Sequence, residues 1–254
     1  VLTDSLAASF PFSSYEIYDE SGIFLGLNKY NRSVAILDIF DSDKYANANG
    51  CIYGTTGAGK TFLLQTMALR FRMQDTQVFI IAPVKGHEYT DACEAIGGKY
   101  IKIAPSSKDC INIMEIRKTS LSTDYEIKTD TRNDSILAEK LQNLMIFFSL
   151  IKPDITQDER LSLMIEKFAT GSLASFGRET NVDLTNKYIV LDMTEMTDAL
   201  KPIGMFMALE FVWDKAKESR IQKKVIFLDE LWTLIGSGAN RLAANYVQEI
   251  FRLI

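Results

Sequence analysis

The sequence Gly54-Thr55-Thr56-Gly57-Ala58-Gly59-Lys60-Thr61 fills every position of the phosphate-binding pattern G-x-x-x-x-G-K-[ST]. The apolar residues 50–53 before it predict a short buried strand, and residues 62–70 after it predict a helix. A strand, a glycine-rich loop and a helix in this order separate a true phosphate loop from a chance match. The alternative interpretation is a glycine-rich turn with a helix-capping threonine.

Each position of this loop has a chemical reason. Glycines let successive backbone N–H groups face a phosphate, and the start of the following helix adds a partial positive charge. We expect Lys60 to act catalytically by contacting the β- and γ-phosphates of ATP, and the Thr61 hydroxyl to bind Mg²⁺. The residues expected to bind the nucleotide are Gly54, Thr55, Thr56, Gly57, Ala58, Gly59, Lys60, Thr61 and Phe62.

Length and composition are those of an ordinary globular protein. The 254 residues are 47% hydrophobic and 24% charged, which suits one large α/β domain or two small ones. The net charge of −5 excludes a general electrostatic attraction to nucleic acid. No apolar run approaches the roughly 18 residues of a membrane span. The three cysteines match no metal-ligand spacing.

Four apolar runs predict the strands of a sheet, at residues 77–82, 100–104, 187–192 and 224–230. Helical patterns lie between these runs, and strands joined through helices pair in parallel. We therefore expect an α/β fold with a mostly parallel sheet. Before the phosphate loop, the apolar segments 22–27 and 34–39 flank a turn-like segment and predict a hairpin.

The pattern changes between residues 117 and 186. Polar turns at 119–134 precede an apolar helix at 136–151, and a second, capped helix is expected from Thr156. Residues 171–181 resemble a loop. We interpret 1–254 as one ATPase domain in which 117–186 form an appended helical lobe.

Both ends of the sequence resemble those of an excerpt from a longer protein. The chain begins at Val1 without a methionine. It ends within an amphipathic pattern that places Leu242, Tyr246, Ile250 and Ile254 on one helix face, with no capping residue after them.

An acidic pair supplies the second half of the predicted site. Asp229 ends the last apolar run, where its carboxylate can hold a Mg²⁺-bound water beside a nucleotide. Glu230 follows it directly and is expected to polarise the attacking water as a general base. Asp192 also ends an apolar run but has no glutamate after it, so it is the second candidate.

The ordered set of motifs resembles the C-terminal ATPase domain of the VirB/TraC/TrbE/CagE-type ATPases of conjugation and type IV secretion. The resemblance covers about residues 22–254 and depends on the order of several segments more than on the phosphate loop. These segments are residues 54–61, 80–83 with Glu88-Tyr89, 95–98, 111–113, 171–174, 180–184 and 227–232.

The resemblance implies a RecA-like core of the HerA–FtsK kind, with a helical lobe and ATP hydrolysis. It also implies homo-oligomers, often hexamers, that join other type IV secretion components at the inner face of the cytoplasmic membrane. The family's loop lysine, magnesium-holding aspartate and neighbouring glutamate correspond to Lys60, Asp229 and Glu230.

The sequence departs from the family in three places. The family usually has an acidic residue where Ala82 stands, and its helical lobe is longer around residues 160–168. The chain also stops before the expected Thr-Gln sensor strand and the arginine given to a neighbouring subunit, so slow hydrolysis is expected of the fragment.

Two other functions fit the same motifs. A HerA/FtsK-like translocase acting directly on DNA would need a basic loop with aromatic residues, and the densest basic cluster is at residues 220–224. A nucleotide-gated assembly scaffold would bind ATP with little turnover. A small-molecule kinase is disfavoured, because the Asp229-Glu230 pair suits water as the acceptor. No motif distinguishes ATP from GTP.

Overall fold

The computed structural model describes residues 16–116, 129–151, 174–219, 221–236 and 241–253. The polar turns expected at 119–134 are described only from residue 129, and there the expectation is wrong, because residues 129–134 are helical. The helix from Thr156 and the segment 160–168 lie outside the described residues. The chain divides after Arg70 into a first unit that ends there and a second unit, Phe71–Leu253. The two units are considered separately below.

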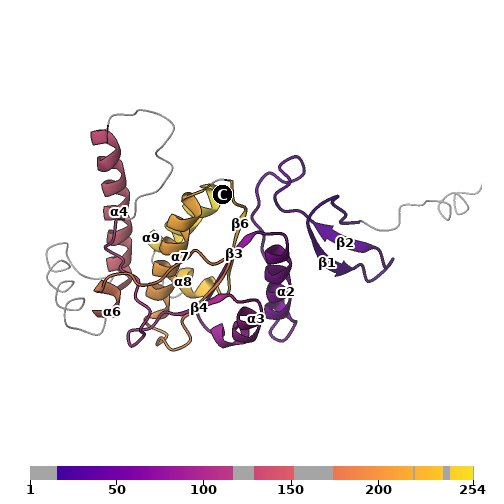
Figure 1. The fold of residues 1–254 in the computed structure, drawn as a ribbon, viewed down its shortest axis with the longest axis horizontal. Helices are drawn as coiled ribbons and strands as arrows, with labels where there is room; N and C mark the ends of the chain where they lie inside the picture. The colour runs from indigo at the N-terminus through magenta and orange to yellow at the C-terminus, as the bar shows by residue number, and fades with distance from the viewer. Residues whose placement is uncertain (1–15, 117–128, 152–173, 220, 237–240, 254) are drawn as a thin grey trace, which may run out of the picture. The chain divides into compact units, whose positions relative to one another are not determined.

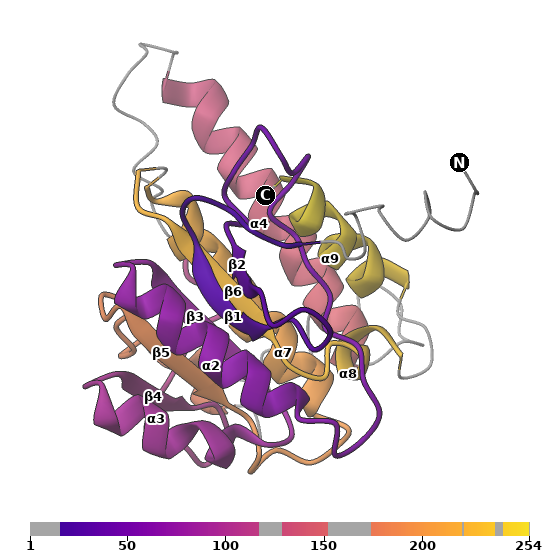
Figure 2. The same cartoon turned by 90° about the vertical axis from the view of Figure 1, so that its right-hand side faces the viewer.

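A four-stranded parallel sheet forms the centre of the second unit (Figure 1). Its strands run in the order β4-β5-β3-β6, which Figure 2 shows face on. Their bounds are β3 Gln77–Ala82, β4 Lys99–Lys102, β5 Tyr188–Asp192 and β6 Lys224–Leu228. Every residue of the two central strands β3 and β5 is buried, as expected for continuous apolar runs between helical layers. The predicted parallel sheet is confirmed.

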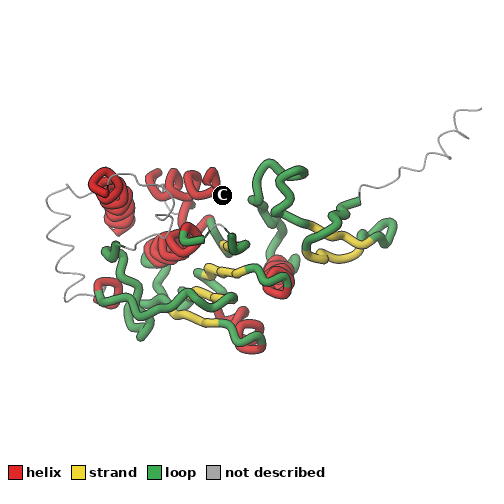
Figure 3. Tube along the Cα trace, turned by 45° about the horizontal axis from the view of Figure 1, so that its top comes forward, coloured by secondary structure: helices red, strands yellow, loops and turns green. Residues whose placement is uncertain are grey.

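Helices connect the strands and cover the sheet. A 3₁₀ turn, η1 Gly86–Tyr89, and α3 Thr90–Ala95 lead from β3 to β4, whereas α7 Lys201–Lys217 leads from β5 to β6. In Figure 3 the red helices α4, α7 and α9 lie on one side of the yellow strands of this unit and α3 on the other. The remaining helices are α4 Thr129–Ile151, α6 Ala174–Gly177, α8 Trp232–Ile235 and α9 Arg241–Leu253.

Helix α7 is the central helix of this layer, since it contacts β3 on one side and α4 on the other. Pro202 stands in its first turn, where a missing N–H does no harm, and its first half is fully buried. Aromatic rings join the three helices: Phe206 of α7 lies 6.4 Å from Phe147 of α4 and 4.9 Å from Tyr246 of α9 between ring centroids. The predicted helix at 136–151 therefore forms and packs on the core through its apolar side.

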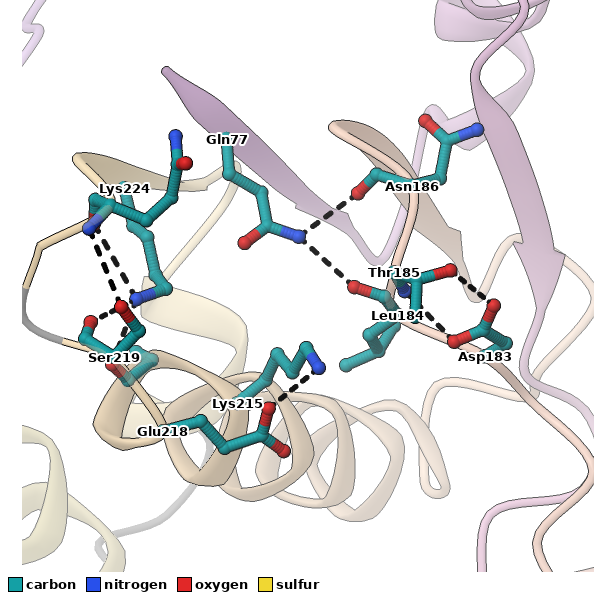
Figure 4. A network of polar contacts seen from close by, with 11 residues as sticks. Gln77, Asp183, Leu184, Thr185, Asn186, Lys215, Glu218, Ser219 and Lys224 are labelled. Carbon is teal, nitrogen blue, oxygen red and sulfur yellow. Dashed lines mark hydrogen bonds and ion pairs between the residues drawn. The ribbon is translucent and has the colours of Figure 1, made fainter. Parts of the chain in front are cut away.

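Polar side chains close the amino-terminal edge of the sheet (Figure 4). The Gln77 amide donates to the carbonyls of Leu184 and Asn186, at 3.0 Å each. The Lys224 ammonium donates to carbonyls at the end of α7 and in the following turn, those of Ala216 at 3.2 Å and of Ser219. A cation at a helix C-terminus satisfies carbonyl groups that the helix itself leaves open.

The first unit contains the predicted hairpin, with β1 Ile23–Leu27 antiparallel to β2 Val34–Leu37. The turn is held locally, because the Asn28 side chain accepts from the N–H of Tyr30 at 2.9 Å. Asp19 joins the preceding segment to the end of β2: its carboxylate accepts from the N–H of Asp38 at 2.6 Å and from the Lys44 ammonium at 2.5 Å.

The predicted helix after the phosphate loop is confirmed as α2 Lys60–Met73, whose interior holds neither glycine nor proline. Arg70 attaches it to the hairpin, because its guanidinium donates to the carbonyl of Phe24 and lies 4.8 Å from the centroid of that ring. Asp75, at φ +60°, ends the helix in a left-handed turn in which the Thr76 N–H donates to the Phe71 carbonyl at 3.1 Å.

The prediction of a strand at residues 50–53 is wrong. These residues form a loop, Cys51 is exposed, and 90% of Tyr53 is accessible to solvent. A four-residue apolar run becomes a strand only where a neighbouring strand completes its hydrogen bonds, and the described residues provide none for it. The apolar pattern could not reveal that requirement.

Candidate functional site

The phosphate loop lies at the N-terminus of α2, in the first unit. Gly57 and Gly59 have φ angles of +81° and +88°, which side-chain-bearing residues rarely adopt. The loop closes on itself through the N–H of Ala58, which donates to the Thr55 carbonyl at 3.2 Å. Gly59, the second glycine of the pattern, and Gly57, which fills one of its variable positions, therefore each have a conformational reason to be glycine.

The Lys60 side chain folds back over this loop. Its ammonium donates to the carbonyls of Gly54 at 2.9 Å and Thr55 at 3.1 Å. A phosphate bound by the loop would offer the ammonium a charged acceptor, and hydrogen bonds between two charged groups are about twice as strong as neutral ones. Residues 54–59 and Phe62 are exposed, and Lys60 and Thr61 are half-buried.

The second half of the predicted site lies in the second unit, at the carboxyl edge of the parallel sheet. Strands β3, β5 and β6 end there at Ala82, Asp192 and Leu228. The N–H of Asp229 donates to the Ile81 carbonyl at 3.0 Å, so the backbone keeps strand pairing up to this carboxylate. Ligand sites of open parallel sheets occur at this edge.

Asp229 has a buried protein partner that the motif analysis did not identify. The hydroxyl of Tyr89, a residue of η1, donates to its Oδ2 at 3.0 Å. Burial raises the pKa of the Asp229 carboxyl above its usual range, and the neighbouring charge of Glu230 raises it further, whereas the Tyr89 hydrogen bond opposes the rise. Burial also raises the pKa of the Tyr89 phenol far above its usual value, so the phenol stays a donor.

Glu230 lies in the turn between β6 and α8 and has an unusual backbone conformation. Its φ of +50° lies in the left-handed region, which disfavours residues with a side chain. Its carboxylate accepts from the indole N–H of Trp232, a largely exposed side chain. Residues held in such conformations are frequent at functional sites.

Asp192, the second acidic candidate, has hydrogen-bond partners within the protein. Its carboxylate accepts from the Tyr100 hydroxyl and from the N–H of Thr194, each at 2.8 Å, and it is 5% exposed. A methyl group added to Gly86 would lie 1.8 Å from its Oδ1, so the η1 turn passes directly against this carboxylate. Asp192 therefore organises the turn that carries Tyr89.

Ala82 ends β3 as a fully buried side chain beside Asp192. The acidic residue that the family usually has at this position is absent here, and the neighbouring carboxylate of Asp192 already has protein partners. Among the acidic residues at these strand ends, Asp229 and Glu230 are the candidates for chemistry.

The donors fit a magnesium ion of the phosphate-loop type. Such an ion takes few protein ligands and keeps water and phosphate oxygens as the others. The described residues contain no group of three or more His, Cys, Asp or Glu side chains placed to hold a metal. A carboxylate whose ionised form is disfavoured by burial and by a like charge gains from a nearby cation, which is the situation of Asp229.

Lys60 and Thr61 belong to the first unit, whereas Asp229 and Glu230 belong to the second. The structure brings the two acidic residues together at one strand end and the lysine and threonine together at one helix start. Their joint action on one nucleotide stays a prediction. Tyr89 was missed as a partner of Asp229, because nothing in a sequence indicates a contact across 140 positions.

Comparison with known proteins identifies the fold. No protein-family model and no curated protein matches the chain. Among solved structures, that of VirB4 of Thermoanaerobacter pseudethanolicus superposes with a TM-score of 0.75 over 94% of this chain and 76% of that chain, at 22% sequence identity. This likeness confirms the predicted α/β fold, and at the level of fold it supports the resemblance to the VirB-type ATPases.

Proposed function

We propose that this chain is the ATP-hydrolysing motor domain of a type IV secretion or conjugation machine, powering the transfer of DNA or protein or the assembly of a pilus. The observation that carries the proposal is a phosphate loop at the start of α2 whose Gly57 and Gly59 have left-handed φ angles, in a chain with the fold of VirB4. Like the VirB-type ATPases that it resembles, it would work as a homo-oligomer with other secretion components.

In this proposal the protein's own groups divide the work. Lys60 exchanges its loop carbonyls for the phosphates and offsets the charge that develops on the γ-phosphate. Thr61 and Asp229 would hold a magnesium ion, which would supply positive charge beside the phosphates. Glu230 orients the attacking water and accepts its proton.

The location follows from the proposed machine. The described residues include no helix of the length and hydropathy that a membrane crossing requires. From the resemblance to the VirB-type ATPases, we propose that the domain works at the inner face of the cytoplasmic membrane and is held there by its partners.

Direct action on DNA is less well supported by the described surface. The densest basic cluster of the sequence is 220–224, and Lys224 within it is half-buried and occupied with carbonyls of Ala216 and Ser219. Arg220 lies outside the described residues. Nucleic-acid grooves use exposed cations that can exchange counterions for phosphate.

The decisive measurement is the steady-state ATPase rate of the intact protein and of its Glu230→Gln variant, each with and without DNA. Loss of a general base should lower turnover about 10²-fold. Stimulation of the wild type by DNA would favour direct translocation. If both proteins bind Mg-ATP and turn it over equally slowly, the role of Glu230 is wrong and the assembly scaffold is the better account.

Lys60→Ala separates motor from scaffold. In a motor this variant loses turnover and transport, because charge on the γ-phosphate is no longer offset, yet subunits can still assemble. In a scaffold the same variant loses nucleotide-dependent assembly, which sedimentation with and without ATP would reveal.

A further inference from the structure

Tyr89 is a buried tyrosine that the proposed chemistry does not yet use. It ends η1, its side chain is 0% exposed, and its hydroxyl donates to Asp229 Oδ2 at 3.0 Å. A hydrogen bond offsets the free-energy cost of removing a buried phenol hydroxyl from water. Asp229, at the end of β6, supplies that partner.

The position of Tyr89 is fixed by contacts outside the pair. The N–H of Gly86 donates to the Thr194 hydroxyl at 3.1 Å, and Gly86 itself packs against the Asp192 carboxylate too closely for any side chain. The η1 turn is therefore anchored just beyond β5, because Thr194 lies two residues after Asp192, the last residue of β5 that pairs with β3. A donor built on an anchored turn can orient the group that it contacts.

We propose that Tyr89 is a positioning residue for the magnesium site, and that it selects the rotamer in which Asp229 meets the hydrated ion. The proposal rests on the function proposed above. By engaging Oδ2, the phenol holds the carboxylate in one orientation before the ion arrives, so that binding does not have to order it. Partners of this kind, which contact a ligand and not the metal, commonly contribute 10- to 100-fold to metal affinity.

The chain offers a matched control. Tyr188 at the start of β5 is also buried, at 1% exposure, and within the described residues its hydroxyl contacts no hydrogen-bond partner. Tyr89→Phe and Tyr188→Phe therefore remove the same atom from similarly buried sites. Only the first removes a hydrogen bond to Asp229.

The test measures binding, without relying on turnover. Binding of a fluorescent ATP analogue to the intact protein is titrated with Mg²⁺, and metal-free binding is measured in excess chelator. We expect Tyr89→Phe to raise about tenfold the Mg²⁺ concentration at which the enhancement of analogue binding is half-maximal, and to leave binding without metal unchanged. Tyr188→Phe should behave as wild type in both measurements. Tyr89→Met, an adaptable apolar side chain without a donor, must show the same shift and serves if Tyr89→Phe does not fold.

Pairing with Asp229→Asn tests whether the effect passes through the carboxylate. In that background Tyr89→Phe should cause no further change in Mg²⁺ dependence. An unchanged Mg²⁺ titration in Tyr89→Phe, while wild type binds the analogue and Lys60→Ala does not, would overturn the role of Tyr89 alone. Failure of wild type to bind the analogue at all would overturn the proposed function as well.

Discussion

Glu230 combines a predicted catalytic role with an unfavourable backbone conformation. At φ +50° a residue with a side chain is less stable by about 1–2 kcal/mol than in the right-handed region, a penalty that glycine escapes. The residue type needed for chemistry is thus retained against the local preference of the turn. This pattern is frequent at functional sites.

Because of the strain at Glu230, we expect the glycine variant at this position to be more stable than the alanine variant, the reverse of the usual order. Glu230→Gly should be more stable than Glu230→Ala, with a free energy of unfolding about 1 kcal/mol higher in a denaturant titration. Leu231, at φ −52°, is the control: there the alanine variant should be the more stable of the pair. An alanine variant at 230 that equals or exceeds the glycine variant would contradict the left-handed assignment.

One carboxylate joins the hairpin of β1 and β2 to the segment that precedes it. Asp19 accepts from the N–H of Asp38 and from the Lys44 ammonium, and these hydrogen bonds lower the pKa of its carboxyl below the usual value. Because the folded pKa lies below the unfolded value, the ionised carboxylate contributes stability that is complete above about pH 4 and is lost as the pH falls through the folded pKa.

Hydrogen exchange across the hairpin tests this contribution. At neutral pH we expect the N–H groups of Asp38 and Ile36, which bond to the segment containing Asp19, to exchange faster in Asp19→Asn than in wild type. The difference should shrink as the pH falls below about 4. A difference that stays constant across that range would show that the carboxylate charge is not what holds the segment.

The helical layer of the second unit contains a buried ion pair. Lys140 of α4 contacts Glu210 of α7 at 2.6 Å, with side chains 8% and 2% exposed. Removing one partner of such a pair leaves a buried charge without its counterion, whereas replacing both by apolar residues is often neutral. The pair therefore specifies how α4 sits on α7 more than it adds net stability.

Lys140→Met should lower the free energy of unfolding by about 3–5 kcal/mol, and adding Glu210→Leu should recover most of the loss. Lys102→Met is the matched control, because Lys102 contacts Glu195 at the same 2.6 Å with both side chains half exposed. Lys102→Met should lower the free energy of unfolding by no more than about 1 kcal/mol. Equal losses in the two lysine variants, measured by denaturant unfolding, would refute a role for burial.

Short-range patterns in the sequence correctly predicted most of the elements. The phosphate loop leads into α2, the apolar runs became β3, β4, β5 and β6, and the turn at Asn28 joins a hairpin. These features depend on periodicity and on the conformational preferences of glycine and asparagine, which act between neighbouring residues. The acidic pair Asp229-Glu230 followed from its place after a buried strand.

Only the tertiary structure decided how the polar groups at the sheet edge are used. Asp192 and Asp229 end similar strands, yet Tyr100 and Thr194 occupy the first carboxylate and Tyr89 orients the second. Residues 50–53 look like a strand but lack a partner among the described residues. Hydrogen bonds and strand pairs join positions far apart in the chain, so their outcome depends on which surfaces the folded core brings together, and no local pattern encodes that.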